Sequence, residues 1–300
     1  MKICIILNGI SRKKNFFYTS IYPTLQQNFK AEIIETQHAK HAIELASWAV
    51  QERFDHVLAA GGDGTLNQVL NGILDQTSLV TLPTVGIIPL GTGNDFAKMC
   101  GLTSDATYFS HLLRKDKPQL TDIGKLICLG ENGETVTKYF INVCSLGMGP
   151  EVVRRLVKSD RSLGPTITYL KAITETFFTH KPQKIHINAS NWEWQGKMRV
   201  LAIANGKSFG NSMYIAPEAL PDDGLFSTFL AKDMALLKFL MFLQLVKAKK
   251  KINSSAIMYN TSTTIEMSAP EPCPIEAEGE WMGWLPAKIE MLPKHINFLR

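Results

Sequence analysis

The most informative stretch of the chain is Val57-Leu58-Ala59-Ala60-Gly61-Gly62-Asp63-Gly64-Thr65-Leu66-Asn67, in which an apolar strand runs into three glycines within four residues and then into a helix. Glycine has no Cβ atom, so the backbone of such a turn can approach a ligand closely. The free N–H groups of the turn and the N-terminus of the following helix favour a bound phosphate. Taken alone, the turn is equally consistent with a tight connection between a strand and a helix.

A second stretch repeats this pattern. Ile87-Ile88-Pro89-Leu90-Gly91-Thr92-Gly93-Asn94-Asp95-Phe96-Ala97 again passes from a strand through a glycine turn into a helix. In a parallel sheet both turns lie at the carboxyl edge, where ligands bind. Neither turn matches GxxxxGK[ST] or GxGxxG, so a Walker-type NTPase and a dinucleotide dehydrogenase are both disfavoured.

The residues around the two turns alternate between strand-like and helix-like patterns. Apolar runs typical of buried strands occur at Lys2–Leu7, Glu32–Glu35, Asp55–Ala60 and Val85–Ile88. Helix-like segments follow these runs at Tyr18–Phe29, from His41 onward, at Leu66–Leu74 and at Asn94–Cys100. Strands that alternate with helices indicate a parallel sheet with helices on both faces.

After residue 120 the pattern changes to short strands, which turns rather than regular helices are expected to separate. We expect these strands at Gly124–Leu129, Val136–Val143, Lys184–Ala189, Met198–Ala204, Leu225–Leu230, Ala256–Met258 and Thr263–Met267. They predict a second, antiparallel β-rich domain with the architecture of a sandwich. The boundary is expected at Lys115-Asp116-Lys117-Pro118.

The composition is that of an ordinary globular protein. Of the 300 residues, 45% are hydrophobic and 20% are charged, which excludes a disordered chain, a collagen-like fibre and a coiled-coil rod. A net charge of +5 mildly favours anionic partners. Without an RNP-like or helix-turn-helix pattern, we expect no nucleic-acid partner. The five cysteines form no CxxC pair, and the first apolar run is too short for a secretory signal, so we expect a cytoplasmic location.

At the two glycine stretches the sequence resembles the diacylglycerol kinase catalytic family, in particular its bacterial lipid kinases. The resemblance continues, in order, through Phe140-Ile141-Asn142-Val143, Leu146-Gly147-Met148-Gly149, Ile203-Ala204-Asn205-Gly206, Ile215-Ala216-Pro217 and Asp222-Asp223-Gly224-Leu225. It implies a doubly wound α/β nucleotide-binding domain over residues 1–120 plus 288–300, to which the chain end returns. It also implies an antiparallel β-sandwich domain for the lipid substrate over residues 121–287.

The resemblance further implies that the first domain binds ATP. Nucleotide contacts are implied for Thr36, Gly61, Gly62, Asp63, Gly64, Thr65, Leu66, Asn67, Thr92 and Asn94. Asp63 and Asp95 are candidates for organising catalytic Mg²⁺ or the attacking hydroxyl, although an aspartate before a helix can simply cap it. Asp122 falls where the family has a functional acid, and the alternative for it is a turn at the start of a strand.

Three glutamates near the end of the chain could supply a general base. Glu276, Glu278 and Glu280 alternate, so on one extended strand they would share a face. Like charges disfavour ionisation and would raise the pKa of one carboxyl, which suits a base for an alcohol. The resemblance implies that Glu280 is this base and accepts the proton of a lipid hydroxyl. A solvated acidic strand is the alternative.

Metal ligands are implied in one further loop. The resemblance implies a structural Mg²⁺ held by Asp223 with the carbonyl groups of Leu220 and Leu225, where the residues alone favour a plain Asp-Gly turn. His38 and His41 could share a helix face. Since no acidic or third histidine partner is expected nearby, we do not expect them to bind a metal.

The sequence departs from the family pattern in three places. The first loop usually reads Asn-Pro-x-Ser-Gly but here reads Asn8-Gly9-Ile10-Ser11-Arg12. The glutamate common after the first glycine motif is replaced by Gln68, and the usual Asp-Gly-Glu reads Glu278-Gly279-Glu280.

The longest apolar stretch, Met234 to Val246, is followed by Lys247, Lys249, Lys250 and Lys251. It is shorter than the roughly 20 residues that a membrane-spanning helix needs. We favour a helix buried between the domains, whose C-terminal dipole the lysines complement. The alternative is a surface that rests on anionic lipid.

These observations together predict a lipid kinase that uses ATP and Mg²⁺, with diacylglycerol as the first substrate candidate and phosphatidylglycerol or a sphingoid base as alternatives. NAD kinase shares the Gly-Gly-Asp-Gly turn, but Pro89-Leu90-Gly91-Thr92-Gly93-Asn94-Asp95 argues against it. A non-catalytic nucleotide- or lipid-binding protein is a third hypothesis, which only Gln68 and Glu278 support. The predicted partner is a membrane lipid, while peripheral contact with the membrane and a dimeric state stay open.

Overall fold

The computed structural model describes residues 1–75, 81–159, 164–210 and 212–300, and within them the chain forms two compact units. The first unit comprises Met1–Ile123 and Pro293–Arg300, and the second comprises Gly124–Leu292. The strands β5 (Gln119–Leu129) and β14 (Glu280–Phe298) contribute residues to both.

The first unit is built on a parallel sheet in the order β4-β3-β1-β2. These strands are β1 (Ile3–Leu7), β2 (Ala31–Glu35), β3 (His56–Gly61) and β4 (Thr84–Pro89). Every residue of β1 and β3 is buried, as expected for central strands covered on both faces. At the end of β14, Phe298 pairs with Val85 of β4 in parallel, so the chain end returns to this sheet.

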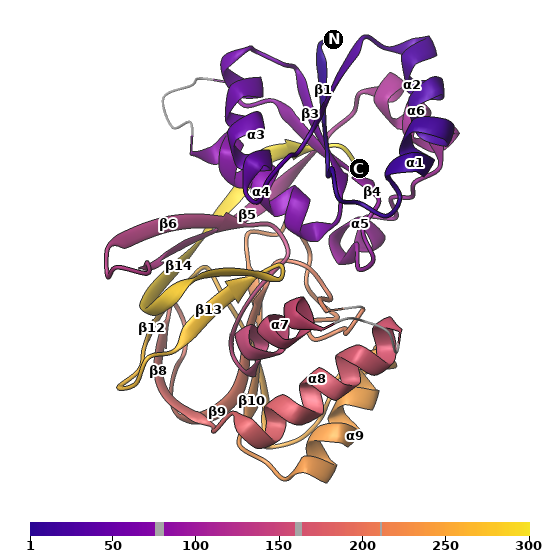
Figure 1. The fold of residues 1–300 in the computed structure, drawn as a ribbon. Helices are drawn as coiled ribbons and strands as arrows, with labels where there is room; N and C mark the ends of the chain where they lie inside the picture. The colour runs from indigo at the N-terminus through magenta and orange to yellow at the C-terminus, as the bar shows by residue number, and fades with distance from the viewer. Residues whose placement is uncertain (76–80, 160–163, 211) are drawn as a thin grey trace. The chain divides into compact units, whose positions relative to one another are not determined.

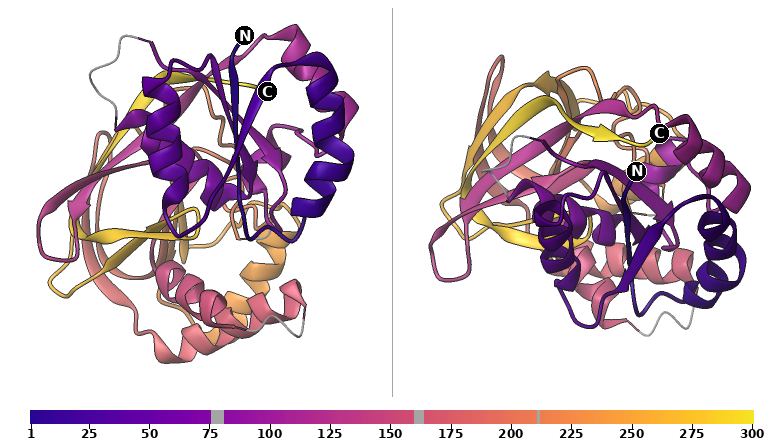
Figure 2. Two further views of the ribbon diagram at one scale, coloured as in Figure 1. Left: turned by 45° about the horizontal axis from the view of Figure 1, so that its top comes forward. Right: turned by 90° about the horizontal axis from the view of Figure 1, so that it is seen from above.

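Helices cover both faces of this sheet (Figures 1 and 2). They are α1 (Lys14–Phe16), the π-helical turn Phe17–Ile21, α2 (Tyr22–Asn28), α3 (His41–Gln51), α4 (Asp63–Leu74), α5 (Asp95–Met99) and α6 (Ala106–Lys115). Phe17 and Phe109 pack with Ile5 and Leu58 of the sheet in one apolar core. The predicted α/β class is therefore confirmed for this part of the chain.

The second unit is a β-structure whose strand pairings close into the ring β9-β7-β13-β14-β12-β8, with β10 and β11 extending it beyond β9 and β6 beside β5. All of these pairings are antiparallel. The strands are β6 (Thr135–Phe140), β7 (Val143–Gly147), β8 (Gln183–Ala189), β9 (Glu193–Ala204), β10 (Phe226–Lys232), β11 (Ile257–Ser262), β12 (Thr264–Ser268) and β13 (Pro274–Ala277).

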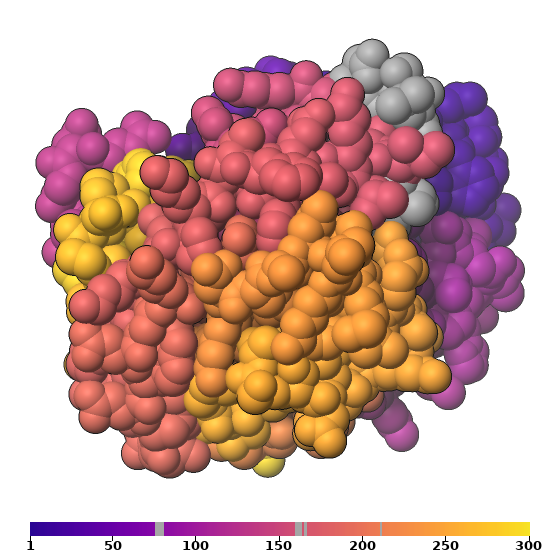
Figure 3. Space-filling view, turned by 90° about the horizontal axis from the view of Figure 1, so that it is seen from below, coloured from indigo at the N-terminus to yellow at the C-terminus, as the bar shows by residue number. Residues whose placement is uncertain are grey.

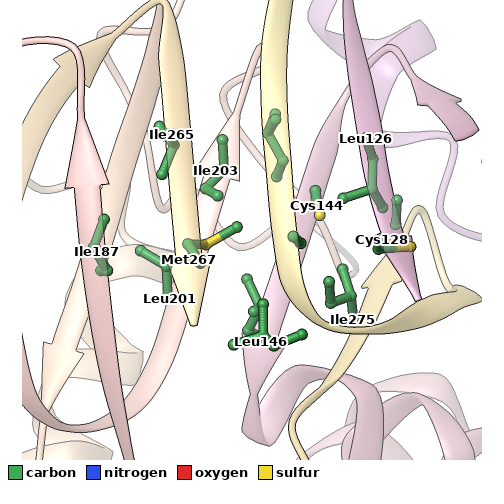
Figure 4. Packing of buried hydrophobic residues seen from close by; sticks show 14 of the residues in the cluster. Leu126, Cys128, Cys144, Leu146, Ile187, Leu201, Ile203, Ile265, Met267 and Ile275 are labelled. Carbon is green, nitrogen blue, oxygen red and sulfur yellow. The ribbon is translucent and has the colours of Figure 1, made fainter. Parts of the chain in front are cut away.

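Alternate side chains of these strands point inward and form the core of the second unit. Leu146, Ile187 and Leu201 meet there with Ile265 and Met267 of β12 (Figure 4). The intervening residues Val143 of β7 and Ala202 and Ala204 of β9 are buried in a second core on the opposite face, so the sheet is apolar on both faces here. The predicted β-sandwich class is confirmed.

Two expectations about the second unit are wrong. Its strands are not separated by turns alone, because α7 (Met148–Lys158) and α8 (Pro165–Thr179) follow β7. Val152 in α7 and Ala172 and Ile173 in α8 are buried and pack together with α9 (Leu236–Lys247). The expected strand Val136–Val143 is also broken into β6 and β7 by a corner at Ile141 and Asn142.

The helix α9 contradicts our preferred interpretation of the apolar stretch Met234 to Val246. Phe242, Leu243 and Val246 are buried in the core of the second unit, but Leu237 is 82% exposed and Met241 is 53% exposed. The helix therefore has one covered face and one open face that carries these two side chains. None of the described helices is long and apolar enough to cross a bilayer.

Candidate functional site

Four loops of the first unit follow parallel strands and therefore meet at the carboxyl edge of the sheet. The backbone N–H of Gly9, after β1, donates to Thr36 Oγ1, after β2, at 3.0 Å. Asn8 Nδ2 donates to Thr65 Oγ1 at 3.1 Å and so joins the first loop to the glycine turn after β3. The structure thus brings Thr36 to the edge that carries both glycine turns.

The two glycine turns pack backbone against backbone. The N–H groups of Leu90 and Gly91 donate to the carbonyl oxygen of Gly61 at 2.8 and 3.1 Å. A Cβ atom on Gly91 would lie 2.5 Å from the Cα atom of Gly62, a distance that real side chains do not tolerate. Glycine is therefore required here by close approach of two loops.

Asp63 joins the two turns through its carboxylate. Its Oδ2 accepts the N–H of Asp95 at 3.0 Å and its Oδ1 accepts the N–H of Phe96 at 3.2 Å, which caps the start of α5. Burial and the neighbouring carboxylate of Asp95 raise the pKa of Asp63, while the hydrogen bonds it accepts oppose that rise. The capping alternative considered for these aspartates thus holds for Asp63, although it caps α5 rather than its own helix.

The edge has features that fit a nucleotide phosphate and a cation. The N-cap of α4, which follows the first glycine turn, is Gly62, a residue without a side chain that could cap the helix. A Cβ atom on Gly93 would lie 3.2 Å from Asp63 Oδ2 and 3.6 Å from Asp95 Oδ2, so two carboxylate oxygens converge beside this glycine. Hard cations such as Mg²⁺ prefer such oxygen ligands.

The remaining predicted nucleotide residues differ in exposure. Thr92 is exposed at the tip of the second turn, and Gly64 is half-buried. Asn94 is buried in a left-handed conformation with φ 51°, and its Nδ2 donates to the Gly91 carbonyl at 2.8 Å. Leu66 and Asn67 are buried within α4.

Asp122 ties the returning chain end to the first unit. Its Oδ1 accepts the backbone N–H of Lys294 at 2.6 Å, and its side chain is fully buried. Asp122 lies within β5 rather than in a turn at a strand start.

The three glutamates do not lie on one strand, so that expectation is wrong. Glu276 ends up in β13 and Glu280 begins β14, and the two strands are joined by Glu278 and Gly279, both with positive φ (56° and 83°). A two-residue turn of this kind reverses the chain into a hairpin. The alternation in sequence could not show this because Glu278 provides no turn signal of its own.

Each glutamate has a different environment. Glu276 is 1% exposed, and its carboxylate accepts hydrogen bonds from the Ser145 hydroxyl and, at 3.1 Å, from the N–H of Gly279. Burial raises the pKa of Glu276 to about 7. The cause of this rise in the pKa of Glu276 is burial rather than a neighbouring charge. Nothing in the sequence around Ser145 pointed to this contact.

Glu278 holds the hairpin to the corner between β6 and β7. Its Oε1 accepts the backbone N–H groups of Ile141 and Asn142, each at 2.7 Å. Glu280 is half-buried at the first position of β14. The carboxylates of Glu276 and Glu278 are therefore both engaged with the backbone that shapes this hairpin.

The predicted metal loop is an exposed turn. Asp223 Oδ1 accepts the N–H of Leu225 at 3.0 Å, and Gly224 has φ 76°. Leu220, Asp223 and Leu225 are exposed at the surface. A carboxylate beside turn carbonyls supplies oxygen donors of the kind that Mg²⁺ takes.

His38 and His41 have an acidic neighbour that our sequence argument overlooked. The ligand atoms of His38, His41 and Glu44 lie within 4.8 Å of one another. Glu44 follows His41 by one helical turn, which is the signal that could have found it. His41 Nδ1 accepts the N–H of Gln37 at 3.0 Å, so in the neutral ring Nε2 carries the hydrogen and is unsuited to a metal.

Comparison with known proteins identifies similarities along nearly the whole chain. Residues 2–126 match the profile of the diacylglycerol kinase catalytic domain, and residues 142–300 match the YegS C-terminal NAD kinase beta sandwich-like domain. The chain is 28% identical to a diacylglycerol kinase of Bacillus subtilis over 91% of its own length and 86% of that protein.

Two solved structures share the fold. The crystal structure of a diacylglycerol kinase from Bacillus anthracis superposes with a TM-score of 0.72 at 20% identity, over 99% of this chain and 96% of that one. The yeast NADH kinase in complex with NADH gives a TM-score of 0.53 at 12% identity, over 99% of this chain and 82% of that one. At these identities both similarities concern the fold alone.

Proposed function

Since the chain belongs to the diacylglycerol kinase catalytic-domain family of lipid kinases, we propose that it transfers the γ-phosphate of ATP to a lipid hydroxyl, with diacylglycerol as the first candidate. The observation that carries this proposal is the packing of the glycine turns at the carboxyl edge, with Asp63 and Asp95 converging beside Gly93. This arrangement offers backbone N–H groups for phosphate and carboxylates for a cation within one edge.

We assign the phosphates of ATP to the turn from Gly61 to Asn67 and to Thr92, and further nucleotide contacts to Thr36 and Asn94. The position of α4 supports this assignment, because a helix N-terminus that directly follows a glycine turn attracts an anion. Thr36 is placed at the same edge by its bond with Gly9.

We assign Mg²⁺ to two places. Asp63 and Asp95 would hold the catalytic ion, and Asp223 with the carbonyl groups of Leu220 and Leu225 would hold a structural one. A bound Mg²⁺ neutralises the charge that develops on the transferred phosphoryl group. Asp122 would support this site indirectly, because one of its carboxylate oxygens already accepts the N–H of Lys294.

We assign the general base to Glu280. Glu278 uses Oε1 to hold two backbone amides, and Glu276 is sealed from solvent, so neither is placed to meet a substrate hydroxyl. Glu280 would accept the proton of the lipid hydroxyl while the hydroxyl oxygen bonds to the γ-phosphorus. The bond from the γ-phosphorus to the β–γ bridging oxygen breaks at the same time, and ADP leaves.

The test is transfer of label from γ-labelled ATP in the presence of Mg²⁺ to diacylglycerol, phosphatidylglycerol, sphingosine or NAD. We expect label in a lipid and none in NAD. Label in NAD alone would favour the NAD kinase alternative, and ATP binding without transfer to any acceptor would favour a non-catalytic protein.

A lipid acceptor implies contact with a membrane surface, and we propose a cytoplasmic protein that makes this contact peripherally. The five cysteines are all free in the structure, which suits a reducing compartment.

A further inference from the structure

The open face of α9 carries two large apolar side chains, Leu237 and Met241, together with the exposed amide of Gln244. Leu237 and Met241 are one turn apart on the side opposite the buried Phe242, Leu243 and Val246. Leu237, at 82% exposed, presents nearly its whole side chain to water. Such exposure of large apolar side chains on one stripe costs free energy in a free monomer and marks a contact surface when it is contiguous.

The neighbouring helix α8 also exposes a large apolar side chain. The rings of Phe177 in α8 and Phe239 in α9 lie 5.1 Å apart between centroids, so the two helices are side by side there. Phe178, which follows Phe177, is 71% exposed, and Leu237 and Met241 flank Phe239. In the space-filling view of Figure 3, the residues of α8 (red-pink) and of α9 (orange) lie next to each other on the surface. We call Phe178, Leu237 and Met241 the α8–α9 face.

The charged side chains of α9 and of the residues just after it are all positive. Residues 236–251 contain no aspartate or glutamate and hold five lysines, Lys238, Lys247, Lys249, Lys250 and Lys251. Lys251 pairs with Glu218, and Lys249 lies over the Tyr214 ring. Lys247 and Lys250 make no ion pair within the described part of the chain.

We propose that the α8–α9 face docks onto a bilayer that contains anionic lipid. The exposed apolar side chains would enter the boundary between headgroups and acyl chains, and the lysines would lie at the level of the lipid phosphates. A second copy of the chain fits less well, because a two-fold contact would bring two sets of lysines together. This inference rests on the proposed function in one respect, since it supplies the contact with the bilayer in which the lipid acceptor resides.

The test is co-sedimentation with vesicles in the absence of nucleotide, comparing phosphatidylcholine alone with phosphatidylcholine containing phosphatidylglycerol. We expect binding to the anionic vesicles that weakens as salt is raised. Leu237→Ser with Met241→Ser, and separately Lys247→Glu with Lys250→Glu, should each weaken binding at least about tenfold. The matched controls Leu120→Ser and Lys30→Glu, at exposed positions of the first unit, should bind as the unchanged chain does.

Transfer of phosphate to a short-chain diacylglycerol dissolved as monomers separates this inference from the proposed function. The face variants should keep that activity while losing vesicle binding. Vesicle binding that survives both pairs of substitutions overturns the docking face and leaves the kinase proposal standing. If the unchanged chain binds vesicles but transfers phosphate to no lipid, the kinase proposal is overturned and the docking face stands. Sedimentation velocity that shows a dimer dissociating in the Leu237→Ser, Met241→Ser variant would assign the face to a second copy and overturn the proposal.

Discussion

The carboxylate of Asp63, at the start of α4, accepts the N–H of Asp95 at 3.0 Å and so caps the helix that follows the second glycine turn. Asp63→Ala removes this cap and should lower the free energy of unfolding by about 1 kcal/mol. Asp63→Asn keeps one acceptor oxygen and removes the repulsion from the Asp95 carboxylate, so its stability should stay close to that of the unchanged chain. Thermal unfolding without nucleotide measures both.

The same pair of variants tests the metal assignment. If Asp63 holds the catalytic Mg²⁺, Asp63→Asn loses turnover although it is stably folded. An Asp63→Asn protein with normal turnover would leave Asp63 as a helix cap only.

Glu280→Gln should lower turnover by about 10²–10⁴ while the protein stays folded, because the amide cannot accept the proton of the lipid hydroxyl. Glu271→Gln, at an exposed position before β13, is the matched control and should leave turnover unchanged. Turnover of Glu280→Gln within a few-fold of the control would remove Glu280 from the role of base.

The sequence predicts the first unit well because its signals are local. The strands β1 and β3 are nearly continuous apolar runs in the sequence, and each glycine turn directly follows a strand. The sequence alone therefore predicts that both turns lie at the carboxyl edge of the sheet. The packing of Gly91 on Gly62 could not be inferred, since it depends on how two loops distant in sequence approach each other.

The second unit is harder to predict from sequence, because its strands pair with partners that are distant along the chain. Its ring of strands is closed by pairings between β8, β12 and β14, which no local pattern reveals. The hairpin at Glu278 was mistaken for one strand because alternation persists through a two-residue turn. The role of Glu276 depends on Ser145, 131 residues away in sequence.

Glu276 should make stability fall as the pH rises. Burial raises its native pKa from an ordinary 4.5 to about 7, so the native state binds this proton more tightly than the unfolded state does. The resulting stabilisation is complete below pH 4.5 and is lost as the pH rises through about 7. Its full size is on the order of 3 kcal/mol.

Glu276→Gln removes that titration. Urea unfolding at pH 5 and pH 8 should show that the unchanged chain loses stability relative to the variant on going to the higher pH. The shape of the side chain is kept, so effects of all other groups cancel in the comparison. An equal difference between the two proteins at both pH values would contradict a buried Glu276 with a raised pKa.

Removal of metal tests the loop at Asp223. If this turn holds a structural Mg²⁺, EDTA should lower the melting temperature of the unchanged chain but have little effect on Asp223→Ala, which has already lost the ligand. Asp222→Ala is the control, because the carboxylate of Asp222 is exposed next to Asp223 but is not assigned to the ion. A melting temperature that does not respond to EDTA in any of the three proteins would make the loop a plain turn.

Gly91→Ala should disrupt the edge at which both glycine turns meet. Its Cβ atom would lie 2.5 Å from the Gly62 Cα and 2.7 Å from Asn94 Oδ1, so one of the loops must move. Displacement of packed backbone costs about 1–3 kcal/mol, and binding of a fluorescent ATP analogue should be lost with it.

Gly93→Ala is the graded comparison, because its nearest contact is 3.2 Å, to Asp63 Oδ2, and no backbone is displaced. The free energy of unfolding of Gly93→Ala should be close to that of the unchanged chain. Its affinity for Mg²⁺ should be lower, since the new methyl group crowds the two carboxylates. Nucleotide binding by Gly91→Ala equal to that of the unchanged chain would show that the close approach of the turns does not shape the nucleotide site.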